Sequence, residues 1–454
     1  MLERLFHLKE RNTDVKTEII AGITTFMTMA YILFLNPVIL SGTGMDPQAV
    51  MFATAVAAGV VTIAMGLFVN FPIALAPGMG LNAYFAVVAS QNGGMPWQAA
   101  LGAVFISGII FIILTVTKVR QILVVAVPGS LKKAIIVGIG LFITIIGVKL
   151  SQLMVVKAHP IPPTMGEFAK NGIATLKFFE WDIFLGNLTA PEPLLALIGL
   201  TLASILMAKR VKGALLISIV ATTLIGIPME VTNIKDFALT WPSFSNLYIG
   251  ELDIMGALNM GIWTVVFTFT FVELFDTFGT LIGTAGKAGL INEKGESPHI
   301  GRAMLVDAFG VSFGALMGTS TLTAYVESAA GIGEGGRTGL TAVTTGILFL
   351  LALVLAPFAA LIPNAATAPV LIIVGLLMVS AIKEIDFDDM TEGIPAFLTF
   401  ILMPFTYNIA NGIAAGIVFH TILKVVTGKA KQVHWMMYIL FVLVIVRYIF
   451  LGGE

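Results

Sequence analysis

The sequence has no cysteine, which excludes disulfides, thiol catalysis and cysteine-bound metal ions. Charge is also missing over long distances: between Glu18 and Lys118 the only charged residue is Asp46, and between Arg337 and Lys383 there is none. Of the 454 residues, 57% are hydrophobic and 11% are charged, and apolar segments of about 20 residues recur along the chain. A soluble globular fold is therefore excluded, and the sequence predicts a polytopic protein of a lipid bilayer.

Motifs for metals, cofactors and nucleic acids are equally scarce. The five histidines are scattered without an HExxH or other ligand spacing, so we expect no metal and no cofactor. A net charge of -1 gives no reason to expect nucleic acid as a partner. The segment Met1–Lys16 is basic, but the apolar run after it is longer than a signal-peptide core and lacks a small-residue cleavage site, so we do not expect its removal.

Hydrophobicity predicts an all-α fold with fourteen membrane spans, of which the third and tenth are broken. The predicted spans are Thr17–Leu40, Ala49–Val69, Ile73–Ser90, Trp97–Thr117, Leu131–Leu150, Leu194–Ala208, Ala214–Ile227, Gly261–Ala285, Ala303–Met317, Ser320–Ile332, Leu340–Leu361, Pro369–Ile382, Ile394–Phe405 and Ile409–Val426. A further apolar stretch, Val433–Phe450, is long enough to cross, but Arg447 and its amphipathic ends leave a position along the surface equally open.

The distribution of Lys and Arg supports this topology. With the N-terminus in the cytoplasm, nineteen cations fall on predicted cytoplasmic segments and five on external ones, with Arg447 unassigned. Dropping one span would invert every later loop. We therefore expect a multi-pass protein of the cytoplasmic (inner) membrane with a cytoplasmic N-terminus.

Two external connectors, Ser151–Pro193 and Pro228–Met260, hold the Pro, Asn and acidic residues that are missing elsewhere. The second connector separates two halves of seven spans each. Seven is odd, so similar halves would have opposite orientations, as in the inverted repeats of many secondary transporters. A short echo, Leu81–Phe85 against Leu322–Val326, lies in the third span of each half and favours this interpretation.

The third and tenth spans are the least helix-like parts of the apolar sequence. One contains Ala76–Gly80, whose Pro lacks an N–H and whose glycines tolerate extended or left-handed backbone, and the other is bounded by glycines at Gly318 and Gly333. Interrupted spans in corresponding positions of two halves indicate a transporter binding site. Half-helices beginning near Leu81 and Leu322 would direct free N–H groups at a ligand.

Carboxylates occur where apolar residues are expected: Glu273 and Asp276 in the eighth span and Glu327 in the tenth. A charge near the bilayer centre costs at least about 2.5 kcal/mol, so such groups usually serve a substrate, an ion or a proton. No Lys or Arg lies within these two spans to neutralise them. Since Glu273 and Asp276 share a helix face, we expect at least one carboxyl to be protonated near neutral pH, which suits a proton carrier.

Other polar residues have alternative interpretations. Asn82 lies just after the break and suits a ligand or the broken backbone equally, whereas Asp307 is interpreted as a structural partner. Tyr31, Tyr84 and Tyr325 are candidates to stack on a flat ligand, although membrane tyrosines commonly just pack.

Three motifs carry a family resemblance: Ala76–Phe85, Phe271–Thr280 and Ala324–Gly331. They resemble the signatures of the AzgA-like purine permeases, a branch of the nucleobase–cation symporter (nucleobase–ascorbate transporter) superfamily that carries hypoxanthine, guanine and adenine. The resemblance extends from the N-terminal segment to the end of the fourteenth span. It implies a uracil-permease-type fold with short strands and half-helices in spans three and ten.

In that fold the resemblance implies a core made of residues 17–128 and 259–362, a gate made of 129–228 and 363–428, and a C-terminal segment 429–454. Substrate binds between the two broken spans, where the resemblance implies contacts from Glu273, Glu327, Asn82, Ala83, Ala324 and Tyr325. It assigns proton coupling to Asp276 and Glu327. A homodimer joined through the gate is also implied.

These observations predict a secondary transporter, not an enzyme, that imports guanine, hypoxanthine or adenine with H⁺, while Na⁺ remains open as the coupling ion. A carrier of uracil, xanthine or an anion on the same fold is the alternative within transport. A membrane-embedded hydrolase is a weaker alternative, because the site offers Glu, Asp and Glu in place of two catalytic Asp residues.

Overall fold

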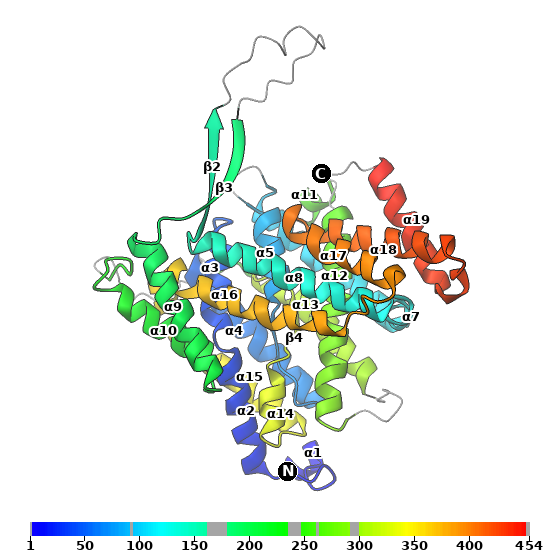
Figure 1. Cartoon of the computed structure of the whole chain (residues 1–454). Coiled ribbons are helices and arrows are strands. Elements are labelled where there is room, and N and C mark those ends of the chain that lie inside the picture. Colours follow the sequence, from blue (N-terminus) through cyan, green and yellow to red (C-terminus); the bar gives the residue numbers. More distant parts are fainter. Residues whose placement is uncertain are drawn as a thin grey trace.

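The computed structural model describes residues 2–90, 94–160, 179–234, 247–259, 263–290 and 299–450. Within these ranges, the side chains at 121, 124, 158–160, 179–182, 259, 263–264, 275–276, 278–279, 282 and 450 lie outside the description, so nothing follows here for the Asp276 carboxylate. Helices dominate the described chain (Figure 1).

The helices follow one another as α1 (Leu2–Phe6), α2 (Val15–Met29), α3 (Ile32–Ser41), α4 (Pro47–Ala64), the π-helical turn η1 (Met65–Val69), α5 (Met79–Val88), α6 (Trp97–Val116), α7 (Val119–Ala126), α8 (Gly129–Leu150), α9 (Pro191–Ala208), α10 (Ala214–Gly226), α11 (Ile254–Asn259), α12 (Trp263–Lys287), α13 (Ile300–Met317), α14 (Ser328–Gly333), α15 (Gly339–Leu351), the 3₁₀ segment η3 (Ala352–Leu361), α16 (Asn364–Val379), the 3₁₀ turn η4 (Ser380–Glu384), α17 (Met390–Phe405), α18 (Ile409–Val426), the 3₁₀ turn η5 (Ala430–Gln432) and α19 (Trp435–Phe450). Two strand pairs complete the fold. They are β1 (Leu75–Pro77) with β4 (Leu322–Ala324), and β2 (Met154–Pro160) with β3 (Phe179–Leu185), both antiparallel.

The described helices follow the predicted spans closely. Nine helical stretches in the described chain are long and apolar enough to cross a membrane, in agreement with a multi-pass protein. The third and tenth spans are broken as predicted, each into a strand and a short helix. The count of fourteen spans and the inverted repeat stay predictions.

Several elements differ from the prediction. The first span is divided at Ala30–Tyr31, where the Leu33 N–H bonds to the Ala30 carbonyl oxygen at 3.2 Å in a tighter turn. The first external connector contains the β2–β3 hairpin, and α7 and α11 were not predicted. These elements were missed because hydropathy detects membrane spans, whereas a hairpin and short amphipathic helices leave no long apolar run.

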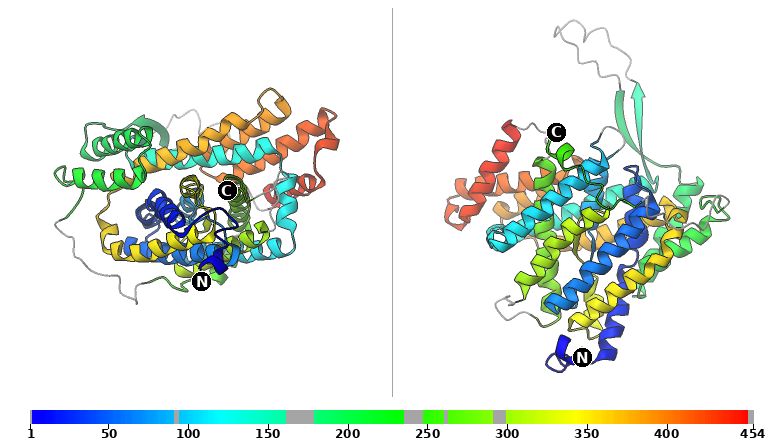
Figure 2. Two further views of the ribbon diagram at one scale, coloured as in Figure 1. Left: turned by 90° about the horizontal axis from the view of Figure 1, so that it is seen from below. Right: turned by 180° about the vertical axis from the view of Figure 1, so that it is seen from behind.

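The helices form two packed groups, visible as two layers in Figure 2 (left). In one group α8 packs on α16 and α17, α17 packs on α18, and α9 packs on α16 and α10. In the other, α13 packs on α6 and α4, α15 packs on α2 and α4, and α12 packs on α6. The strands β1 and β4 pack against α4, α12 and α13, so they belong to this second group.

Glycines allow α4 and α15 to approach closely. A Cβ added at Gly346 would lie 2.6 Å from the Gly59 carbonyl oxygen, and one added at Gly66 would lie 2.4 Å from the Gly339 carbonyl oxygen. Each glycine pair is two helical turns from the other. Small residues at such positions let membrane helices gain backbone-to-backbone packing where no hydrophobic effect between helices is available.

Glu18 of α2 holds the beginning of α15. Its buried carboxylate accepts hydrogen bonds from the backbone N–H of Arg337 at 2.8 Å and of Thr341 at 3.2 Å, and from the Thr341 hydroxyl at 2.6 Å. A carboxylate at a helix N-terminus satisfies free N–H groups and the helix dipole. This acid therefore has a structural role that its place beside the first apolar run does not reveal.

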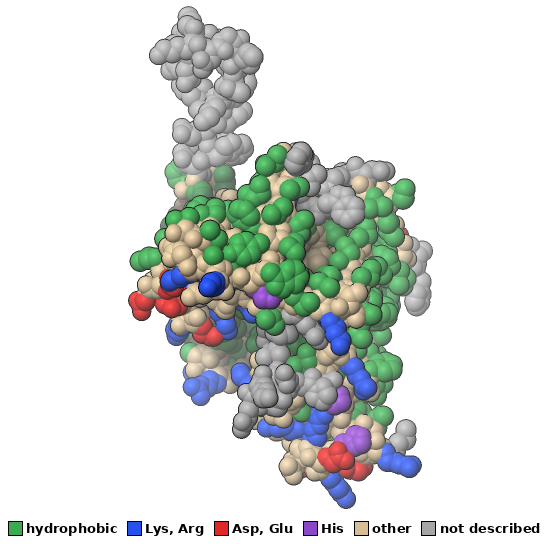
Figure 3. Space-filling view, turned by 90° about the vertical axis from the view of Figure 1, so that its right-hand side faces the viewer, with side chains coloured by type: hydrophobic (Ala, Val, Ile, Leu, Met, Phe, Trp, Pro, Cys, Tyr) green, Lys and Arg blue, Asp and Glu red, His purple; other side chains and the backbone are tan. Residues whose placement is uncertain are grey.

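Charge is unevenly distributed over the surface. On the face shown in Figure 3, apolar side chains cover most of the upper body, and Lys, Arg and His gather toward the end that carries the N-terminus. Asp and Glu side chains lie at the same end, and which side of a membrane this end faces stays a prediction.

The glycine contacts predict the effect of a substitution. We expect Gly346→Val to force α15 away from α4 and to destabilise the detergent-solubilised protein by about 1–3 kcal/mol, the usual cost of overpacking. A thermal unfolding curve measures this. Gly283→Val is the matched control, because open space surrounds the corresponding position of α12. Equal midpoints for the two variants would contradict the packing argument.

Candidate functional site

The centre of the second helix group is a crossing of two unwound segments. Leu75 pairs with Ala324, Ala76 with Thr323 and Pro77 with Leu322, and all of these residues are buried. Because the strands are antiparallel, α5 and α14 leave the crossing from opposite ends. Non-helical backbone at membrane depth requires such internal hydrogen bonds.

Further bonds fix the crossing beyond the strand ladder. The Gly78 N–H donates to the Thr321 carbonyl oxygen at 3.0 Å, and the Ala74 N–H donates to the Ser328 hydroxyl at 3.0 Å. The Tyr325 hydroxyl donates to the Pro77 carbonyl oxygen at 2.5 Å. Tyr325, predicted to contact substrate, thus also links the two strands, and its neighbour Ala324 is a buried strand residue.

Glu327 lies at the N-terminal end of α14 and is half-buried. One of its carboxylate oxygens, Oε1, accepts a hydrogen bond from the Tyr31 hydroxyl at 2.7 Å. Tyr31 occupies the break between α2 and α3, so the division of the first span positions this donor. The structure therefore shows Tyr31 as a hydrogen-bond donor to Glu327. The sequence alone suggested only that Tyr31 stacks on a ligand or packs.

Glu273 is fully buried on α12 and meets Thr277 one turn later. The Thr277 hydroxyl oxygen lies 2.9 Å from Glu273 Oε1, 3.0 Å from Asp307 Oδ1 and 3.0 Å from the Thr323 hydroxyl of β4. Glu273 is thus linked to Thr323 of β4 through Thr277. Glu327 follows the last residue of β4, Ala324, by three positions in the chain.

Asp307 of α13 forms an ion pair that the sequence did not reveal. Its Oδ2 accepts a hydrogen bond from Arg120 Nη2 at 3.0 Å, and both side chains are fully inaccessible to solvent. Arg120 also donates to the Met304 carbonyl oxygen at 3.2 Å, and its guanidinium lies 4.5 Å from the ring centroid of Phe111. A buried ion pair of this kind needs such extra contacts to offset desolvation.

Arg120 was missed for a specific reason. The topology prediction assigned it to a cytoplasmic loop, since it lies between two spans. The signal that could have found it is the apolar segment around it, Val119 to Val127, which is too short to span but too hydrophobic for a solvated loop. Asp307 has a structural partner as expected, and that partner comes from α7.

Asn82 of α5 is a buried amide for which the described residues supply no partner. Neither its Oδ1 nor its Nδ2 has a hydrogen bond to the described part of the chain, although the residue is fully inaccessible to solvent. Its neighbour Ala83 is equally buried, and Tyr84 packs edge-to-face on Phe269 of α12 at 5.2 Å. A buried amide left unpaired is costly, which points to a ligand that would complete its hydrogen bonds.

The sequence echo between the two halves does not hold as a structural equivalence. Leu81–Phe85 is helical, whereas Leu322–Ala324 is a strand whose partner is Leu75–Pro77. The short helices begin at Met79 and Ser328, so the predicted start near Leu322 is wrong. The five residues were matched on their order and on their place in each half, whereas the extended backbone of Leu322–Ala324 depends on its pairing with Leu75–Pro77.

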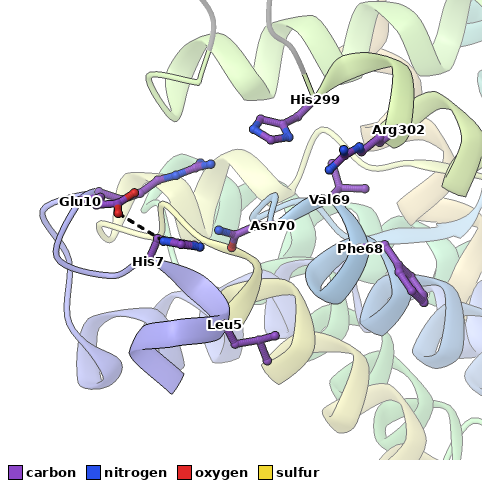
Figure 4. Close-up of a pocket in the computed structure, with 9 residues that line it drawn as sticks. Leu5, His7, Glu10, Phe68, Val69, Asn70, His299 and Arg302 are labelled. Carbon is purple, nitrogen blue, oxygen red and sulfur yellow. Dashed lines mark hydrogen bonds and ion pairs between the residues drawn. The ribbon is translucent and has the colours of Figure 1, made fainter. Parts of the chain in front are cut away.

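A separate cavity of about 320 Å³ lies at the N-terminal end of the molecule (Figure 4). Its lining includes Arg11, Asn70, His299 and Arg302, and it contains none of the predicted site residues. Burial, Arg11 and Arg302 together lower the pKa of His299. The cavity lining carries two arginines and one glutamate and shares no residue with the paired strands, so the cavity is not the predicted site.

Comparison with known proteins places the chain among transport proteins. A model described as the permease family matches residues 16–415. A protein of Methanocaldococcus jannaschii is 46% identical over 100% of this chain and 99% of its own length. The adenine permease AdeP of Escherichia coli is 41% identical over 100% of this chain and 97% of its own, and the guanine/hypoxanthine permease PbuG of Bacillus subtilis is 41% identical over 99% and 100%.

Among solved structures, the transmembrane domain of the cyanobacterial bicarbonate transporter BicA is similar. The TM-score is 0.59 at 16% identity, with 88% of this chain and 97% of that domain covered. At this low identity the comparison shows a shared fold and says nothing about the substrate of this chain.

The unpaired amide predicts a gain in stability on substitution. We expect Asn82→Leu to raise the thermal midpoint of the ligand-free protein, because removing an unpaired buried amide relieves about 1–3 kcal/mol of desolvation. Asn36→Leu is the control. Asn36 is equally buried, but its Nδ2 donates to the Thr54 and Thr319 hydroxyls at 2.8 Å each, so its loss should destabilise. Destabilisation by both substitutions would mean that Asn82 has a structural role.

Proposed function

Because the chain belongs to the permease family, we propose that it is a secondary transporter that imports purine nucleobases, guanine, hypoxanthine or adenine, together with protons. The strongest support is that an amide without a hydrogen-bond partner among the described residues and two carboxyl groups belong to elements that meet at the β1–β4 pair. Asn82 offers a donor and an acceptor that the described residues leave unpaired, Glu273 offers a carboxyl linked to β4 through Thr277, and Glu327 offers a carboxylate just after β4 in the chain.

Such a site suits a purine chemically. A purine is flat, largely apolar and uncharged, with several donors and acceptors in its plane. A carboxylate accepts two adjacent N–H bonds from guanine, and these charge-assisted bonds are stronger than neutral ones. The names of the relatives AdeP and PbuG extend the substrate class to adenine, guanine and hypoxanthine.

An anion is a poorer substrate for this arrangement. Of the described cations, Arg120 is the one that reaches the site network, and Asp307 already neutralises it. Glu273 and Glu327 leave the region acidic. The alternatives within transport therefore narrow to uracil and xanthine, which a competition assay with unlabelled bases separates from purines of the guanine and adenine type.

Transport is proposed to proceed by alternating access between a core (17–128 and 259–362) and a gate (129–228 and 363–428), with 429–454 as a C-terminal segment. The separate packing of the two helix groups supports this division. The antiparallel pairing of β1 with β4 supports an inverted repeat, since a two-fold axis in the membrane plane reverses chain direction. A homodimer through the gate, an inner-membrane location and a cytoplasmic N-terminus complete the proposal.

Substrate recognition is tested by neutral substitutions. We expect Glu273→Gln and Glu327→Gln each to reduce guanine, hypoxanthine or adenine uptake at least tenfold, because an amide leaves donors of the base unpaired at a cost of about 1–3 kcal/mol. Radiolabelled counterflow in proteoliposomes measures this. Glu334→Gln is the control, as that carboxylate pairs with Lys212 in an exposed ion pair. Full uptake by both site variants would refute the site.

Proton coupling is tested by the driving force. One proton contributes about 1.4 kcal/mol per pH unit and about 2.3 kcal/mol per 100 mV. We expect an imposed inward proton gradient to drive accumulation without Na⁺, and a protonophore to abolish accumulation while counterflow continues. Accumulation that follows a Na⁺ gradient and ignores the protonophore would assign the coupling to Na⁺.

A further inference from the structure

The short helix α7 connects the two helix groups. It follows α6 of the second group and precedes α8 of the first, and it packs on α6, α12 and α19. Its one described cation, Arg120, is fully buried and points into the second group toward Asp307. The segment that joins the proposed core to the proposed gate is therefore attached to the site network by a charge.

The contacts among Thr277, Glu273 and Asp307 need more hydrogen-bonding protons than are present when both carboxyl groups are ionised. Thr277 has a single hydroxyl hydrogen, yet its oxygen lies within 3.0 Å of Glu273 Oε1 and of Asp307 Oδ1. It can donate to one of them only. The other contact is favourable only when that carboxyl is itself protonated and donates to Thr277, so the arrangement needs at least one proton on Glu273 or Asp307.

Arg120 pairs with one of these two carboxyls. Its guanidinium, bonded to Oδ2, stabilises the ionised form of Asp307 against the cost of burial. With Asp307 ionised, the proton resides on Glu273, which donates to Thr277, and Thr277 donates to Asp307. When Glu273 loses its proton, the Thr277 hydroxyl turns to Glu273, and Asp307 loses a hydrogen bond while it remains paired with Arg120.

We propose that Arg120 is a positioning residue that communicates the protonation of Glu273 to the α7 linker through Asp307 and Thr277. The Thr323 hydroxyl on β4 contacts the same Thr277 oxygen, so the strand crossing responds to the same event. This inference rests on the proposed function, because it supplies a route from proton binding to the movement of the two helix groups.

Other titratable groups on elements packed against α12 do not replace this route. Asp307 is the one among them whose carboxylate reaches Thr277 in the described structure. The remaining described groups are Tyr84 on α5, Arg120 on α7, Lys132, Lys133 and Lys149 on α8, Arg302 on α13, Glu327 before α14, and His420 and Lys424 on α18.

The experiment measures purine affinity as a function of pH, using the full-length protein in nanodiscs and radiolabelled guanine, hypoxanthine and adenine. In Arg120→Gln, Asp307 takes up a proton and donates to Thr277, which then donates to ionised Glu273. The pH midpoint of the affinity curve should therefore fall by about 1 unit or more. Arg120→Lys should restore most of the midpoint. Lys118→Gln, which removes an exposed cation just before α7, should leave it unchanged.

Thr277 provides a second test that leaves the Arg120–Asp307 pair intact. In a Thr277→Val background, Arg120→Gln should no longer move the midpoint, whereas in Thr277→Ser it should. Wild-type affinity that is independent of pH, or an equal midpoint in wild type and Arg120→Gln, would overturn the relay while purine binding itself upholds the transport function. Absence of purine binding by the wild type at every pH would instead overturn the proposed function.

Discussion

The mutual hydrogen bonding of two unwound segments is the constraint on which the rest of this structure depends. Leu75–Pro77 and Leu322–Ala324 cannot form helical hydrogen bonds, and an apolar interior offers no water to replace them. Each segment satisfies the other. Because their partners are about 250 residues away in sequence, the pairing also fixes how the two halves of the chain meet.

Polar side chains then collect around this crossing, since its backbone has already made the interior locally polar. Glu327 has Tyr31, Glu273 has Thr277, and Asp307 has Arg120. Glu327 and Asp307 have partners from other elements, whereas Thr277 lies one turn from Glu273 on the same helix, and each contact reduces the cost of burying the carboxyl group. Asn82 differs from these acids, because none of the described residues supplies it with a donor or an acceptor.

Stability and function therefore impose different requirements on neighbouring residues. The α4–α15 glycine contacts and the Glu18 carboxylate at the start of α15 make a firm scaffold beneath the site. At the site itself, the Thr277 hydroxyl contacts the carboxyl groups of both Glu273 and Asp307, and the Asn82 amide has no partner among the described residues. Incomplete hydrogen bonding of this kind is expected at a functional site, where a bound ligand or proton supplies the missing bonds.

Sequence reasoning located the broken spans and the acidic residues because both violate the apolar pattern around them. It failed at Arg120, since a cation between two spans looks like an ordinary loop residue. It also matched Leu322–Ala324 with Leu81–Ala83, although the former is a strand paired with Leu75–Pro77. Local similarity could not show which backbone would be extended, because the extension is stabilised only by its distant partner.

The sequence by itself determined that this chain is a multi-pass membrane protein with two interrupted spans and buried acids, because the bilayer imposes length and hydrophobicity on every span separately. Tertiary structure alone decided which donors Glu327 and Asp307 receive. Tyr31 and Glu327, and Arg120 and Asp307, are separated by 296 and 187 residues. Hydrogen bonds act over a few ångströms, so such partners become visible only when the folded chain brings them into contact.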